Sequence, residues 1–185
     1  MKCVALIGPQ GSGKTSLARM LQRRYGYIGM GIAEPIKEIA GMAYPGLDKR
    51  EMLTLDTATG HRYISGRQIL QEVGGALRQV DPLFWLRIAA KSYKHYRKGG
   101  HLVVIDDLRL AREADYLAGE FPELLIVAVY ASDEQRAERL GKVLGSWDVT
   151  ETDYVNSRYD FAIDTTGMTT EDAFSALLRG MEDHA

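Results

Sequence analysis

GPQGSGKT, at residues 8–15, is the most informative segment of this sequence. An apolar run at residues 3–7 precedes it and predicts a buried strand, and apolar residues at helical spacing follow it. A strand, a glycine-rich turn and a helix in this order form the context that the phosphate-binding motif G-x-x-x-x-G-K-[ST] requires. A glycine-rich turn that contains Lys-Thr by chance is the alternative, but the segment and both of its flanks agree with the motif.

The residue types of this segment suit the binding of phosphate. Its glycines lack a Cβ, so they can adopt positive φ and let backbone N–H groups converge on phosphate oxygens. The following helix adds unpaired N–H groups and a favourable dipole. We expect Lys14 to reach the β and γ phosphates of ATP and the Thr15 hydroxyl to hold Mg²⁺. The predicted nucleotide-binding residues are Gly8, Gly11, Ser12, Gly13, Lys14, Thr15 and Ser16.

Length and composition limit the class of protein. A chain of 185 residues can form one compact domain, and 45% hydrophobic and 26% charged residues are ordinary for a soluble globular protein. The formal net charge of −2 argues against a general nucleic-acid or membrane surface. Any binding of phosphate must therefore come from locally placed arginine and lysine side chains.

The cellular compartment is predicted from cysteine usage and apolar runs. The single cysteine, Cys3, lies in the first apolar run, which predicts a core residue in a reducing compartment. That run is too short for a signal-peptide core, and no other run approaches the length of a membrane span. These features predict a cytoplasmic protein.

Residues 66–78 carry a second chemical signal. On a helix, Arg67, Gln71, Gly74 and Arg78 form one stripe at spacing i, i+4, i+7 and i+11, opposite an apolar face. Two guanidinium groups and an amide on one stripe suit an anionic, hydrogen-bonding ligand. A solvated helix face would have the same composition, and only the phosphate-binding motif upstream favours the functional reading.

Two carboxylates end an apolar strand predicted at residues 101–107. A carboxylate at the end of such a strand, in a chain with a phosphate loop, is placed to hold the Mg²⁺ shell. Asp106 fits the pattern of four apolar residues and an aspartate best, and Asp107 points to the opposite side of the strand. Both stay candidate metal ligands. Arg109 follows at the carboxyl end of the sheet, where ligands of open α/β folds bind.

The remaining apolar runs complete an α/β pattern. Strands are predicted at about residues 27–33, 124–129 and 159–163, with helices between them. Fully apolar strands are typical of a parallel sheet that is buried on both faces. We therefore expect a three-layer α/β fold, with a central, mostly parallel sheet of about five strands flanked by helices.

Local signals predict further boundaries. Asp81-Pro82 predicts a helix with Asp81 at its N-cap. Ser132, followed by Gln135, predicts a capping box that opens a helix over residues 133–144. Residues 48–65 show little pattern and predict an irregular excursion with one or two helical turns.

Several segments together resemble one family. The phosphate loop, residues 33–38, residues 66–74, Trp85 and residues 104–113 are similar to the deoxynucleoside monophosphate kinases of the bacteriophage type, relatives of adenylate and thymidylate kinases. The segments R-x-x-L-Q-x-x-G and D-x-R-x-x-x-E carry the likeness, which also extends to the animal-type phosphomevalonate kinases. Asp107 is the residue that fits D-x-R.

The resemblance implies roles for individual residues. Arg109 would contribute to catalysis and to acceptor binding, and Arg136 and Arg139 would lie near the donor nucleotide and its transferring phosphate, as catalytic residues with Lys14. The residues implied for the acceptor monophosphate and its base are Lys37, Arg67, Gln71, Arg78, Trp85, Asp107 and Arg109, with Trp85 alternatively a core residue.

The function expected from these signals is transfer of the γ-phosphoryl group of ATP to a (deoxy)nucleoside monophosphate, with Mg²⁺. One kinase domain would span residues 1–185, with an acceptor-binding insert at about 34–98 and a small lid at about 136–159. The expected partner is a small-molecule nucleotide, not a nucleic acid or a membrane, and a homodimer stays open. Two alternatives remain: a kinase acting on another phosphorylated acceptor, as phosphomevalonate kinases do, and a nucleotide-binding regulatory ATPase that is not a kinase.

Overall fold

The computed structural model of the protein describes residues 1–141 and 152–184. The chain divides into two compact units. The main unit comprises Met1–Gly31 and Ala89–Ala185, and the inserted unit comprises Ile32–Ile88. The acceptor-binding insert predicted at about 34–98 overlaps the inserted unit. Part of the predicted lid, residues 142–151, lies outside the described residues.

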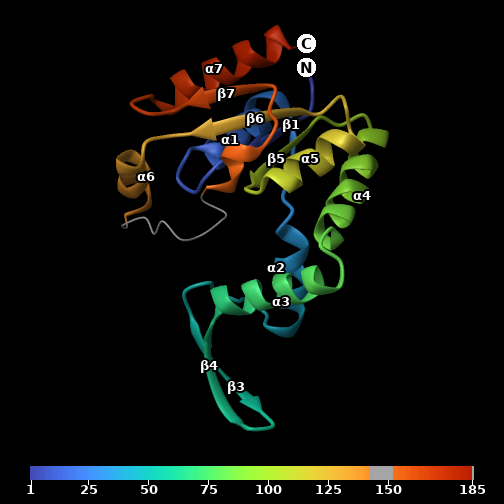
Figure 1. Ribbon diagram of the computed structural model, residues 1–185, viewed down its shortest axis with the longest axis vertical. Helices are drawn as coiled ribbons and strands as arrows, with labels where there is room; N and C mark the ends of the chain where they lie inside the picture. The colour runs from blue at the N-terminus through green and yellow to red at the C-terminus, as the bar shows by residue number, and fades with distance from the viewer. Residues whose placement is uncertain (142–151, 185) are drawn as a thin grey trace. The chain divides into compact units, whose positions relative to one another are not determined.

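The main unit is built on a five-stranded sheet (Figure 1). Its order is β2-β5-β1-β6-β7, and every neighbouring pair is parallel. This arrangement confirms the predicted three-layer α/β fold with a parallel central sheet. The strands are β1 (Val4–Ile7), β2 (Ile28–Met30), β5 (Val103–Leu108), β6 (Leu125–Tyr130) and β7 (Phe161–Asp164).

Helices cover the sheet because its strands are apolar on both faces. All residues of β1 are buried, as are all but the last residue of β6. Leu17 and Leu21 of α1 pack in one core cluster with Phe174 and Leu177 of α7. The helices of this unit are α1 (Lys14–Tyr25), α5 (Ala111–Glu120), α6 (Asp133–Leu140) and α7 (Thr170–Asp183), with a short 3₁₀ turn at Asp153–Asn156. None of the described helices has the length and apolar character needed to cross a bilayer.

The inserted unit contains a β-hairpin where the sequence predicts an irregular excursion, so that prediction is wrong. Strands β3 (Met52–Thr57) and β4 (Gly60–Ser65) pair antiparallel between α2 (Glu34–Ala43) and α3 (Gly66–Val80). Alternation in β3, where Leu53 and Leu55 are half-buried and Thr54 and Asp56 are exposed, is the signal that was missed. The leucines pack on a small core of Ala40, Ile64 and Ile69.

Two other boundaries differ from the predictions. Helix α4 (Phe84–Lys98) begins three residues after Asp81, whose carboxylate instead accepts a hydrogen bond from the Leu83 backbone at 2.9 Å. Helix α6 ends at Leu140 because Gly141 adopts φ of 61° and closes the helix.

The predicted capping box at Ser132 forms only in part. The Ser132 hydroxyl accepts a hydrogen bond from the Gln135 backbone, as expected. The Gln135 side chain, however, accepts a hydrogen bond from the Gly167 backbone at 2.8 Å. This side chain thereby links α6 to the connection between β7 and α7.

Candidate functional site

The phosphate loop joins β1 to α1 and has the backbone that its glycines predict. Gly8, Gly11 and Gly13 adopt φ of 148°, 81° and 100°. At Gly8, a Cβ would lie 2.0 Å from the Val129 carbonyl oxygen, so only glycine allows β6 to approach this closely. Gly13 is the N-cap of α1, and the first backbone N–H groups of that helix therefore belong to the loop.

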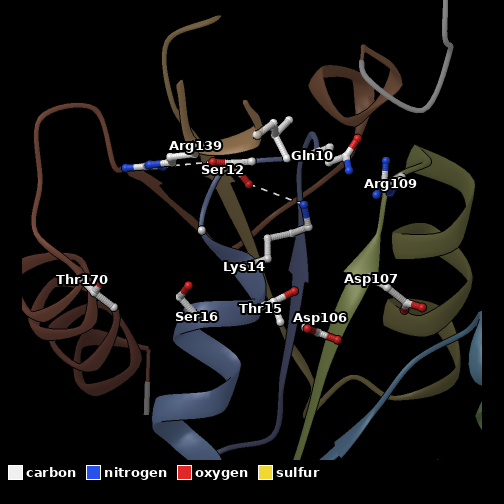
Figure 2. Close-up of a pocket in the computed structure, with 13 residues that line it drawn as sticks. Gln10, Ser12, Lys14, Thr15, Ser16, Asp106, Asp107, Arg109, Arg139 and Thr170 are labelled. Carbon is white, nitrogen blue, oxygen red and sulfur yellow. Dashed lines mark hydrogen bonds between the residues drawn. The ribbon is translucent and has the colours of Figure 1, made fainter. Parts of the chain in front are cut away.

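Lys14 is folded onto its own loop. Its side-chain ammonium donates hydrogen bonds to the carbonyl oxygens of Gly8 and Pro9, both at 2.7 Å. It also approaches the Ser12 hydroxyl at 3.5 Å (Figure 2). The residue is only 7% exposed. A positive charge is therefore fixed at the centre of the loop, where β and γ phosphates are expected.

A cavity of about 420 Å³ opens over this loop (Figure 2). Its walls come from the loop, the end of β5, α6 and the start of α7. The cavity brings the predicted loop residues other than Gly8 together with both aspartates, Arg109 and Arg139. It is lined by Gln10, Gly11, Ser12, Gly13, Lys14, Thr15, Ser16, Asp106, Asp107, Arg109, Arg139, Leu140 and Thr170.

The two aspartates of β5 have different surroundings. Asp106 lies beside Thr15, whereas Asp107 points away from it (Figure 2). The Asp107 carboxylate lies against Gly31, where a Cβ would come within 2.7 Å of its oxygen. The geometry therefore favours Asp106 as the metal ligand.

The donor set beside the loop fits Mg²⁺. Thr15 and Asp106 supply hard oxygen atoms, which magnesium prefers. The described residues contain no group of three or more histidine, cysteine, aspartate or glutamate side chains arranged to hold a metal. Mg²⁺ commonly keeps few protein ligands and completes its shell with substrate phosphates and water, so this sparse set suits a nucleotide-bound ion.

The two arginines of α6 bind the backbone of the phosphate loop. Arg136 is 6% exposed, and its Nε donates a hydrogen bond to the Gln10 carbonyl at 2.8 Å. Arg139 donates to the Gly11 carbonyl and to the Thr165 carbonyl, both at 3.0 Å. Arg139 lines the cavity, and Arg136 is not among its lining residues. A direct contact of Arg136 with a transferring phosphate stays a prediction.

A smaller hollow of about 260 Å³ adjoins the loop on the α7 side, and the sequence did not indicate it. Gly13, Ser16, Arg139 and Thr170 line both hollows. Residues 165–173, which line part of this hollow, follow the last strand of the parallel sheet. Their place at the carboxyl end of the sheet is the signal that could have indicated a binding site. The other lining residues are Leu17, Gln135, Thr165, Met168, Thr169 and Ala173.

The inserted unit has a basic pocket of its own, of about 230 Å³. It brings together the predicted acceptor residues Lys37, Arg67, Gln71 and Arg78, and adds Lys49, which the sequence analysis missed. The other lining residues are Ala33, Ile36 and Leu70, and none of the lining residues is acidic.

Three other predicted acceptor residues lie elsewhere, and one of them, Asp107, lines the cavity over the phosphate loop. Trp85 is 1% exposed, and its indole N–H donates a hydrogen bond to the Gly74 carbonyl at 2.9 Å. It does not line the basic pocket and acts as a core residue that fixes α3. Arg109 lines the cavity of the main unit, and its backbone N–H donates to the Glu113 carboxylate at 2.9 Å.

A parallel sheet with a phosphate loop after β1 and an aspartate on the neighbouring strand β5 defines a P-loop NTPase fold. Within that class, residues 4–144 match the AAA domain family model AAA_18, and the chain belongs to this family. A search of curated protein sequences finds no match.

Solved structures with the same fold include several kinases. A gluconokinase from Sinorhizobium meliloti 1021 is 19% identical, with 100% of this chain and 93% of that chain covered and a TM-score of 0.60. A shikimate kinase from Aquifex aeolicus vf5 is 15% identical, with 98% and 96% covered and a TM-score of 0.60. Mycobacterium tuberculosis APS kinase, in complex with AMPPNP and APS, is 14% identical, with 98% and 97% covered and a TM-score of 0.59. At these identities the likeness concerns the fold.

Proposed function

We propose that the protein is a kinase that transfers the γ-phosphoryl group of ATP to a (deoxy)nucleoside monophosphate. The observation that carries this proposal is the basic pocket of the inserted unit, in a chain whose main unit holds a phosphate loop. The kinases that share the fold support phosphoryl transfer to a small molecule. The resemblance to the bacteriophage-type kinases supports a nucleotide as the acceptor.

The donor binds at the phosphate loop. Backbone N–H groups at the start of α1 and the Lys14 ammonium hold the β and γ phosphates. Thr15 and Asp106 would hold Mg²⁺, which when bound neutralises the phosphate charge that develops in the transition state. The hollow beside Thr165 and Met168 is the place for the donor base, because it continues the cavity at Gly13 and Ser16.

The acceptor binds in the basic pocket. Arg67 and Arg78 offer planar guanidinium groups that pair with a phosphate in a bidentate manner, and the Gln71 amide can both donate to and accept from a base. A phosphate monoester is a nucleophile near neutral pH, so the reaction needs no general base. Catalysis then consists of positioning and charge stabilisation, to which Arg109 and Arg139 contribute at the cavity over the loop.

A coupled assay of ADP formation tests the proposal. Purified protein with ATP and Mg²⁺ is given a panel of ribo- and deoxyribonucleoside monophosphates, with gluconate, shikimate and phosphomevalonate as rival acceptors. We expect at least one nucleoside monophosphate to stimulate ADP formation far above the rate with water alone. A rival acceptor that turns over while every nucleotide fails would overturn the nucleotide proposal and leave a small-molecule kinase.

The same assay separates a kinase from an ATPase without an acceptor. An ATPase does not need the basic pocket, so Arg67→Ala and Arg78→Ala would leave its rate unchanged. For the proposed kinase we expect either substitution to lower kcat/KM for the acceptor by about 10–100-fold, because a charge-assisted bond to phosphate is lost. Glu38→Ala on α2, which lies outside the pocket lining, serves as the control.

A further inference from the structure

We propose that Lys49 is an acceptor-binding residue and that the β3–β4 hairpin, with the turn before it, holds Lys49 at the basic pocket. The inference rests on the proposed function and adds a residue and a device that the sequence did not indicate. Lys49 lies between α2 and β3 in the chain, far from the arginine stripe of α3, yet it lines the same pocket.

The main chain fixes the turn to the start of α3. The Arg67 N–H donates a hydrogen bond to the Lys49 carbonyl at 3.0 Å, and the Gly66 N–H donates to the Glu51 carbonyl at 2.9 Å. The approach is so close that a Cβ on Gly66 would lie 2.1 Å from the Asp48 carbonyl oxygen. The backbone of Lys49 is therefore hydrogen-bonded to the backbone of Arg67, which lines the same pocket.

The hairpin fixes this arrangement from the other side. Ser65 caps α3 and accepts a hydrogen bond from the Gln68 N–H, while the Gln68 side chain accepts one from the Ser65 N–H. Arg62 of β4 forms a bidentate ion pair with Glu72 of α3. Together with the leucines packed below it, these contacts make the hairpin and α3 one body.

Lys49 changes the charge that the pocket can accept. Four lining residues are basic, namely Lys37, Lys49, Arg67 and Arg78. Lys37 forms an ion pair with Glu34 at 2.5 Å, which leaves part of its charge compensated. With Lys49, half of the eight lining residues are basic and none is acidic, so the pocket suits an anionic group such as a phosphate monoester.

Steady-state kinetics with matched variants test this role. Lys49→Gln removes the charge at the pocket, and Arg50→Gln removes an equal charge from the next residue, which is exposed and does not line the pocket. We expect Lys49→Gln to raise the acceptor KM about tenfold with an unchanged KM for ATP. Arg50→Gln should stay within twofold of the wild type, and Lys49→Arg should restore most of the acceptor affinity.

Equal acceptor KM values for Lys49→Gln and Arg50→Gln would overturn the proposal, as would a failure of Lys49→Arg to recover affinity while its melting temperature is unchanged. Turnover of nucleotides would meanwhile leave the proposed function in place. The two proposals are thus separable in one set of assays.

Chemical labelling decides the case in which no acceptor turns over. The wild-type protein is labelled with acetic anhydride in the presence of either inorganic phosphate or chloride, at equal ionic strength. The labelled lysines are then quantified by peptide mass spectrometry. We expect phosphate to slow labelling of Lys49 several-fold and to leave Lys98, exposed on α4, unaffected. Equal protection of both lysines, or of neither, would contradict an anion site at Lys49.

Discussion

A single ammonium group organises the phosphate loop. The carbonyl oxygens of Gly8 and Pro9 hold the Lys14 side chain within the loop, so the charge is already in place before a nucleotide arrives. Little reorganisation is then needed when phosphate binds, which is the condition for strong electrostatic stabilisation.

Replacement of this lysine should be the most damaging single change to turnover. We expect Lys14→Met to lower kcat by about 10²–10³-fold, because a preorganised charge at the transferring phosphate is removed. The coupled assay measures the change, with Lys98→Met as a control for the loss of one positive charge. A Lys14→Met variant with wild-type turnover would exclude the loop as the donor site.

The two aspartates of β5 should respond differently to neutralisation. Asp106 lies beside Thr15, whereas Asp107 lies against Gly31. We therefore expect Asp106→Asn to raise the Mg²⁺ concentration for half-maximal rate by about tenfold or more, and Asp107→Asn to shift it less. Titration of the rate with MgCl₂ gives both values. The reverse order would assign the metal to Asp107.

Because of Tyr27, we expect the free energy of unfolding to fall at alkaline pH. The residue is 3% exposed, its hydroxyl donates to the Lys2 carbonyl at 2.7 Å, and burial raises its pKa from 10.0 to about 12. Between these values the unfolded chain has lost the phenolic proton and the folded chain keeps it. The stabilisation is therefore complete below pH 10 and falls by up to about 1.4 kcal/mol per pH unit as the pH rises toward 12.

Urea unfolding of the wild type and Tyr27→Phe checks this sign. At pH 8 we expect the wild type to be more stable by about 1 kcal/mol, from the hydroxyl hydrogen bond. The difference should shrink or reverse at pH 11, since phenylalanine has no proton to lose. A difference that is constant from pH 8 to 11 would show that Tyr27 titrates at its ordinary pKa in the folded protein.

Individual residues were predictable where chemistry imposes a fixed spacing. The loop residues follow from G-x-x-x-x-G-K-[ST], and the structure places all of them except Gly8 at one cavity. Arg67, Gln71 and Arg78 follow from the helical period, and they line one pocket. Lys49 has no such spacing to the α3 stripe. Its place depends on hydrogen bonds between segments that are not adjacent in the chain, so a linear pattern could not indicate it.

Helix α6 lines the cavity and also holds the phosphate loop through side-chain hydrogen bonds to the loop backbone. Arg136 contacts the Gln10 carbonyl, Arg139 contacts the Gly11 carbonyl, and Gln135 contacts the Gly167 backbone. These three side chains connect the loop to the segment between β7 and α7. The helix therefore positions both hollows of the proposed donor site.

Arg136 should act through the loop. Its side chain is 7% exposed, so we expect Arg136→Ala to lower the free energy of unfolding by about 1–3 kcal/mol and to raise the KM for ATP more than it lowers kcat. Arg23→Ala, on the exposed face of α1, should change stability by less than about 0.5 kcal/mol. A large fall in kcat with an unchanged KM for ATP would instead support the predicted direct contact with the transferring phosphate.

Whole elements were predictable where apolar runs were long. The parallel strands and the helix after the loop follow from their periodicity, whereas the hairpin was missed because only β3 alternates and β4 is exposed over most of its length. The prediction of Asp81 as a helix N-cap failed in a similar way. Its carboxylate does accept a hydrogen bond from a backbone N–H group, that of Leu83, but this bond lies in a turn before α4. Short polar elements depend on tertiary contacts that propensity does not contain.

At the scale of the whole molecule, the proposed donor and acceptor sites belong to different units of the chain. Among the described residues, none lines both the cavity over the loop and the basic pocket. We therefore expect the double variant Arg67→Ala and Arg78→Ala to bind a non-hydrolysable ATP analogue within twofold of the wild type. Lys14→Met should likewise bind the acceptor normally. Calorimetric titration measures both, and a tenfold change in either would reveal energetic coupling between the units.

The path of the chain through the central sheet makes the inserted unit suited to exchange between homologous proteins. The backbone leaves this sheet after β2 and re-enters it at β5, and these two strands are parallel neighbours, with Ile28 opposite Val103. Replacing the unit from Ile32 to Ile88 with that of a homologue would keep the strand order and the phosphate loop. Under the proposed function, hybrid proteins made this way would inherit their choice of phosphoryl acceptor from one parent and their nucleotide chemistry from the other.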